Sequence, residues 1–168
     1  MNRILVAAIL AVLLLTLMTS HPPTMKMFAT VHANEGACSL ATVAGNYGFT
    51  LTGTLVLPTS GVPVAGTGLA TISEAGNFSG TESRSVGGGV AQETLGGTVT
   101  VNSDCTGALT APVFESGQLV RTSVFSLVFD DNARELRAIQ TSLVLPDGTS
   151  VPNVITVEGR KIGRGKGE

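Results

Sequence analysis

Apolar and polar residues alternate with a period of two along most of this 168-residue chain, from residue 44 to about residue 161. The segment Tyr47–Leu57 shows the pattern most clearly, because Phe49, Leu51 and Leu55 share one face and threonine occupies positions 50, 52 and 54 on the other. This period is that of a β-strand with one dry face and one wet face. We therefore predict an all-β protein.

Short segments rich in Gly, Pro, Asn and Asp divide this region into about eight strands joined by hairpins. One helical turn is expected first, at Ser39–Ala44. An antiparallel up-and-down barrel is favoured, because eight strands can close around a small interior and leave no open edge. A Greek-key sandwich is the alternative. The expected strands are Tyr47–Leu57, Val64–Ser73, Asn77–Arg84, Ala91–Asn102, Cys105–Val113, Leu119–Phe129, Glu135–Leu145 and Val151–Gly159.

The first 33 residues are typical of an export signal. Asn2 and Arg3 precede the apolar run Ile4–Met18, which suits a signal peptide and is short for a membrane span. We predict cleavage after Ala33, with a weaker site after Ala29 and a lipid-modified Cys38 as the alternatives. The protein is then expected to be periplasmic or secreted, with a barrel domain at residues 34–159 and no integral membrane span in the mature chain.

Residues 160–168 form a basic segment rich in glycine. Such a composition predicts a disordered tail, which would serve solubility. Contact with an acidic surface such as lipid or polysaccharide is the alternative.

Cleavage would remove both histidines, His21 and His32, together with all four methionines. Histidine is the usual general base near neutral pH and the commonest metal ligand. The sequence therefore argues against histidine-dependent hydrolysis, and we expect neither a metal nor another cofactor. The formal charge of −2 also lacks the basic field of a nucleic-acid binder, so nucleic acid is not an expected partner.

Cys38 and Cys105 are the two cysteines of the chain. In an exported protein the default interpretation is one disulfide. By the chain-entropy argument, closing a loop of about 65 residues stabilises the fold by roughly 4 kcal/mol. Two buried free thiols are the alternative.

Three short motifs carry a resemblance to known proteins: GNYGF at Gly45–Phe49, GNFSG at Gly76–Gly80 and VNSDCTG at Val101–Gly107. Over Cys38–Gly159 the chain resembles exported bacterial proteins of unassigned role, which are similar to the allene oxide cyclase and dirigent type of eight-stranded barrel. The resemblance implies a barrel and a cysteine pair, and it implies no established reaction. Plant barrels of this type guide ring closure or radical coupling inside an apolar cavity, but none of their catalytic motifs can be placed here.

Several polar residues share strand parity with residues of the expected apolar interior. Glu82 aligns with Phe78, Glu93 with Leu95, Arg121 with Phe125, and Gln140 with Ala138. A carboxylate in an apolar cavity would have a raised pKa and could act as an acid or base, especially beside Arg121 or Arg84. The alternative is that these residues lie near strand ends and reach water. The candidate cavity residues are Glu82, Glu93, Arg121, Gln140 and Phe125.

Two acidic segments have simpler interpretations. Asp104 is expected to hydrogen-bond the backbone of a turn. Asp130 and Asp131 could suggest calcium, but no spaced run of oxygen ligands follows them, so a hairpin turn is favoured.

Three functions are compatible with such a barrel. The first is an exported module that binds a small apolar molecule in its interior. The second is a filled structural or surface-interaction barrel without a ligand. The third is a cofactor-free cyclase or isomerase in which Glu82 or Glu93 polarises the substrate, and it ranks last because no catalytic constellation is evident. The sixth strand is also apolar on its outer side, through Val120, Val124 and Val128, so a homo-oligomer is a plausible assembly.

Overall fold

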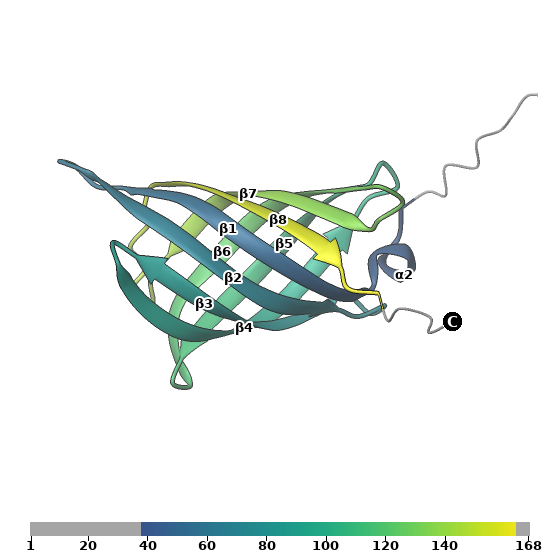
Figure 1. Ribbon diagram of the computed structural model, residues 1–168, viewed down its shortest axis with the longest axis horizontal. Coiled ribbons are helices and arrows are strands. Elements are labelled where there is room, and N and C mark those ends of the chain that lie inside the picture. Colours follow the sequence, from purple (N-terminus) through teal and green to yellow (C-terminus); the bar gives the residue numbers. More distant parts are fainter. Residues whose placement is uncertain (1–37, 164–168) are drawn as a thin grey trace, which may run out of the picture. The chain divides into compact units, whose positions relative to one another are not determined.

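Eight antiparallel strands and one short helix make up residues 38–163, the part of the chain that the computed structural model describes (Figure 1). The predicted helical turn and the eight predicted strands are confirmed, with boundaries that differ by a few residues. The elements are α2 (Leu40–Val43), β1 (Gly45–Val56), β2 (Gly61–Ile72), β3 (Asn77–Val86), β4 (Gly89–Val101), β5 (Thr106–Glu115), β6 (Gln118–Asp130), β7 (Glu135–Val144) and β8 (Asn153–Lys161).

Each strand pairs with the next one in the sequence, and β1 also pairs with β8, where Phe49 lies opposite Gly159. The sheet is therefore a closed up-and-down barrel, as predicted, and the sandwich alternative is wrong. Closure gives every strand two neighbours, so no strand edge is left with a row of unpaired backbone N–H and C=O groups.

Strand β8 continues through Arg160 and Lys161, past the predicted domain end at Gly159. Lys161 pairs with Tyr47 of β1, and its ammonium donates a hydrogen bond of 2.7 Å to the carbonyl oxygen of Thr42. The expected signal peptide, its cleavage site and the last five residues of the basic tail lie outside the described residues. Within residues 38–163, no helix is long and apolar enough to cross a membrane.

The inward faces of the strands form the hydrophobic core, which includes Tyr47, Phe49, Leu127 and Ile155. Glycine is required where strands or side chains approach closely. A Cβ at Gly68 would lie 2.7 Å from the ring of Phe49, and Gly97, with φ of +135°, would place a Cβ against the carbonyl oxygen of Thr110.

The barrel has two different ends (Figure 1). The helix end carries α2 and the β2–β3, β4–β5 and β6–β7 turns, and the hairpin end carries the β1–β2, β3–β4 and β5–β6 turns with the β7–β8 loop. A disulfide joins Cys38 to Cys105 at the helix end, with a Cα–Cα distance of 4.9 Å. The predicted pairing is confirmed, and the free-thiol alternative is wrong.

Tyr47 closes the interior at the helix end. Its side chain is buried, and its hydroxyl donates a hydrogen bond of 2.6 Å to the carbonyl oxygen of Val43, with the carbonyl oxygen of Ala133 at 3.3 Å. Burial raises the pKa of the Tyr47 hydroxyl above its ordinary value. The phenol is therefore neutral and acts as a donor that ties β1 to α2 and to the β6–β7 turn.

The acidic turn residues have the roles expected of them. The Asp104 carboxylate accepts hydrogen bonds from the hydroxyl (2.6 Å) and the backbone N–H (3.0 Å) of Thr106, which lower the pKa of Asp104. Asp131 begins the turn between β6 and β7. In the described part of the chain, no group of three or more His, Cys, Asp or Glu side chains could hold a metal ion.

Candidate functional site

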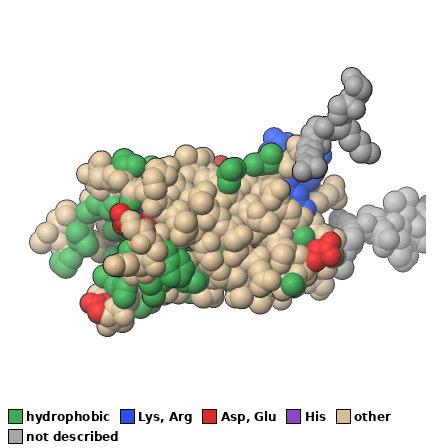
Figure 2. Space-filling view, turned by 90° about the horizontal axis from the view of Figure 1, so that it is seen from below, with side chains coloured by type: hydrophobic (Ala, Val, Ile, Leu, Met, Phe, Trp, Pro, Cys, Tyr) green, Lys and Arg blue, Asp and Glu red, His purple; other side chains and the backbone are tan. Residues whose placement is uncertain are grey.

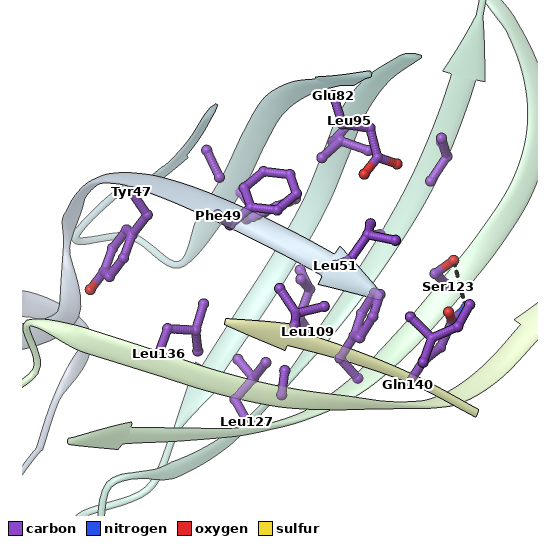
Figure 3. A pocket seen from close by; sticks show the side chains of 18 of the residues that line it. Tyr47, Phe49, Leu51, Glu82, Leu95, Leu109, Ser123, Leu127, Leu136 and Gln140 are labelled. Atoms are coloured by element: carbon purple, nitrogen blue, oxygen red, sulfur yellow. Dashed lines mark hydrogen bonds between the residues drawn. The ribbon is translucent and has the colours of Figure 1, made fainter. Parts of the chain in front are cut away.

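The interior of the barrel contains a cavity of about 70 Å³ with a mainly apolar wall. Several inward-facing side chains, including Leu95, Phe125 and Ala138, are only partly buried because they border this space. Figure 3 shows Tyr47 at one end of the cavity and Ser123 and Gln140 at the other. The side chains of the eight strands therefore leave the interior incompletely filled.

Four charged side chains are buried in the half of the barrel toward the hairpin end. Glu82 and Arg84 come from β3, Glu93 from β4 and Arg121 from β6, and the exposed fractions of these residues are 4, 5, 6 and 7%. The strand-end alternative, in which such residues reach water, is therefore wrong. Charged groups are rarely buried to this degree unless they are paired.

Arg121 supplies the pairing for both carboxylates. Glu82 and Glu93 are direct partners across the β3–β4 ladder, an arrangement that is unfavourable for two like charges. From β6, the guanidinium of Arg121 donates to the two carboxylate oxygens of Glu93, at 2.5 and 2.7 Å, and to Glu82 at 2.9 Å. The bidentate geometry with Glu93 is the strong form of this interaction.

The two carboxyl groups differ in their affinity for protons. Burial, together with a hydrogen bond to Glu93, raises the pKa of Glu82 to about 7. Burial alone would also raise the pKa of Glu93, but the hydrogen bonds from Arg121 and Glu82 outweigh it and lower that pKa below its usual value. The pair thus holds a proton on Glu82 in mildly acidic solution while Glu93 stays ionised.

Arg84 borders the cavity as the fourth buried charge and makes no hydrogen bond to the other three. Its Nε is buried and has no hydrogen-bond partner among the described residues. Burial, and next the positive charge of Arg121, lower the pKa of Arg84. A buried guanidinium nitrogen without a hydrogen bond costs stability unless a further partner binds it.

Ser123 and Gln140 form a separate polar contact on the same side of the cavity. The Gln140 side-chain amide donates to the Ser123 hydroxyl at 2.9 Å, a bond drawn in Figure 3, and to the Ser142 carbonyl oxygen at 3.1 Å. Both side chains line the cavity. This contact gives the apolar wall one neutral polar patch between β6 and β7.

The five candidate residues predicted from strand parity all face the interior. Glu82 and Arg121 line the cavity, and Arg121 binds Glu93, which does not line it. Phe125 and Gln140 line other parts of the cavity wall. Ser123 was missed, although it shares the parity of Arg121 and Phe125.

Exposed apolar side chains surround the hairpin end. Figure 2 shows hydrophobic side chains gathered over this end of one face, while the visible Lys and Arg side chains lie toward the other end. The exposed residues near the ends of β1, β4, β6 and β8 include Val56, Leu57, Val90, Leu119 and Val154.

No protein-family model and no curated protein matches this chain.

Proposed function

We propose that this barrel binds a compact molecule in its interior, with the apolar part of the molecule in the cavity and a polar group toward the buried charges. The observation that carries the proposal is the cavity itself, which is enclosed by the inward faces of the strands and bordered by the charged group of Glu82, Arg84 and Arg121. Pockets of this kind, apolar with a few convergent polar groups, are the usual form of small-molecule sites.

The buried charges support the proposal because well-packed apolar side chains could occupy their positions without loss of stability. Burying an ion pair is often neutral or unfavourable compared with well-packed apolar side chains. The closed sheet and its hydrophobic core already provide hydrogen bonding and apolar burial without them. Costly groups that face a cavity are more readily explained by binding than by stability.

The cavity volume limits the size of the occupant. About 70 Å³ is roughly half of the 150 Å³ cavity that holds benzene in another protein and far below the range typical of drug-sized ligands. The expected ligand therefore has few heavy atoms. The same small volume favours a filled structural barrel as the second candidate.

A cofactor-free cyclase or isomerase is the third candidate. It needs buried carboxyl groups paired with arginine, and Glu82, Glu93 and Arg121 have that arrangement. A pKa of about 7 for Glu82 would also suit proton transfer near neutral pH. Binding remains the first choice because it requires only the cavity and its polar wall.

Native mass spectrometry of the protein purified without refolding tests the proposal. We expect a small molecule that is released on denaturation. Replacing Ala111, which lines the cavity, by leucine should abolish this occupancy, whereas the matched variant Ala108→Leu, on the outer face of the same strand, should retain it. Ala138→Leu is a second filling variant if Ala111→Leu proves too unstable.

Either of two results would favour the filled barrel. One is a bare wild-type chain. The other is an Ala111→Leu variant that keeps the same occupant, since the bound molecule would then lie elsewhere.

A further inference from the structure

Arg84 is the one member of the buried charged group whose partner is missing from the described residues. It is 5% exposed, it borders the cavity, and its Nε has no hydrogen-bond partner there. Arginine carries its donors in a planar fork that matches a carboxylate. The side chain is therefore placed as a ligand-binding group would be.

Arg121 already occupies the two carboxylates that could neutralise Arg84. Glu93 accepts two hydrogen bonds from Arg121, and Glu82 accepts a third. When Glu82 carries a proton, the four groups hold two positive charges and one negative charge. The single excess positive charge then resides on the guanidinium without a partner, Arg84.

A single excess positive charge on Arg84 favours a monoanion over a dianion as the ligand. A monoanion would neutralise Arg84, whereas a phosphate dianion would bring a second negative charge close to Glu93 with no further free cation. The adjoining cavity is apolar and small, so it suits a short hydrocarbon chain.

We propose that the interior binds a compact monocarboxylate, with its carboxylate on the guanidinium of Arg84 and its hydrocarbon part in the cavity. This inference rests on the proposed function and names the class of ligand. Binding then supplies the missing partner of Arg84 and leaves the contacts of Arg121 unchanged.

The test uses the disulfide-bonded protein, with sodium butyrate and its neutral isostere butyramide as probes, in an NMR titration at about pH 6, where butyrate is ionised. We expect butyrate to shift the resonances of Ala111 and Ala138, which line the cavity, and to bind roughly tenfold or more tightly than butyramide.

Arg84→Met should remove this preference, and Arg84→Lys should restore part of it. Arg137→Met, which removes an equal charge from an exposed side chain near the helix end, is the matched control and should keep it. Arg84→Gln is a second neutral variant if Arg84→Met folds poorly.

The outcomes separate this inference from the proposed function. If the wild type binds butyrate and butyramide equally, or if Arg84→Met keeps the preference, the cavity binds small molecules and the role of Arg84 is wrong. If inorganic phosphate, which is mainly a monoanion at this pH, displaces butyrate at equal concentration, the site selects anions without regard to the hydrocarbon chain, and the monocarboxylate assignment is wrong. If neither organic probe shifts the cavity resonances, the proposed function fails as well.

Discussion

The two ends of this barrel differ in how completely their polar groups are paired. At the helix end the Tyr47 hydroxyl donates to the Val43 carbonyl oxygen, Lys161 donates to Thr42, and a disulfide joins Cys38 to Cys105. Toward the hairpin end, charged side chains enter the interior, and the buried Nε of Arg84 lacks a partner among the described residues. The helix end is organised as a stability element, whereas the other half retains groups that cost stability and face a cavity.

Breaking the ion pairs should have the largest effect. Arg121→Met leaves Glu82 and Glu93 buried opposite each other without the cation that hydrogen-bonds both of them, and we expect a loss of about 3–5 kcal/mol in the free energy of unfolding, measured with urea. Arg137→Met, which breaks only exposed pairs, should change it by less than about 0.5 kcal/mol. Equal effects of the two variants would show that the buried carboxyl groups do not depend on Arg121 for charge compensation.

Removing the disulfide tests the helix end. The double variant Cys38→Ala/Cys105→Ala should lose about 4 kcal/mol in unfolding free energy, because its unfolded chain is no longer cross-linked. Its affinity for butyrate should stay within about twofold of the wild type, as the cross-link is remote from Arg84. A large loss of affinity would mean that the two ends are coupled.

The pH dependence of stability reports on Glu82. Its pKa rises to about 7 on folding, so the folded chain binds a proton more tightly than the unfolded chain. This contribution is complete below about pH 4.5 and is lost as the pH rises to about 7, on the order of 2–3 kcal/mol. Glu93, whose pKa is lowered, acts in the opposite direction and at lower pH.

Urea unfolding between pH 4.5 and pH 7 measures this effect, and Glu82→Gln should flatten the profile. An unchanged profile in that variant would assign the titration to another group.

Tyr47→Phe should have a smaller effect. It removes the hydroxyl and leaves the buried carbonyl oxygen of Val43 without this donor, which corresponds to a loss of about 1–2 kcal/mol by urea unfolding. An unchanged stability would mean that the tyrosine contributes to the helix end through its ring alone.

Much of this arrangement could be predicted from the sequence because strand parity is a strict rule. Phe78, Glu82 and Arg84 lie on the same side of β3, so the sequence places all three in the interior. The same rule applies to Ser123, but a serine between apolar residues gives no composition signal, and it was overlooked.

Other features depend on long-range geometry. The reach of Arg121 from β6 to Glu82 on β3 depends on how the barrel closes, and the register shifts at Val113/Phe114 and Val124/Phe125 alter which side chains meet. The extension of β8 to Lys161 was missed because a basic, glycine-rich composition predicted a tail, whereas backbone pairing with Tyr47 continues the strand. The cavity volume is the small difference between the volume that the barrel encloses and the volume that its side chains fill. The pattern of strands in the sequence does not determine this difference.

The most direct test of the contrast between the two ends is urea unfolding of the wild type and Arg84→Met, with and without butyrate. In buffer alone we expect the variant to match or exceed the stability of the wild type, because it loses an unpaired buried charge. With butyrate at about ten times its dissociation constant, the wild type should gain about 1.4 kcal/mol and the variant almost nothing. A variant that is less stable by more than about 1 kcal/mol, together with a wild type that does not respond to butyrate, would make Arg84 part of the fold and contradict a binding role for this end of the barrel.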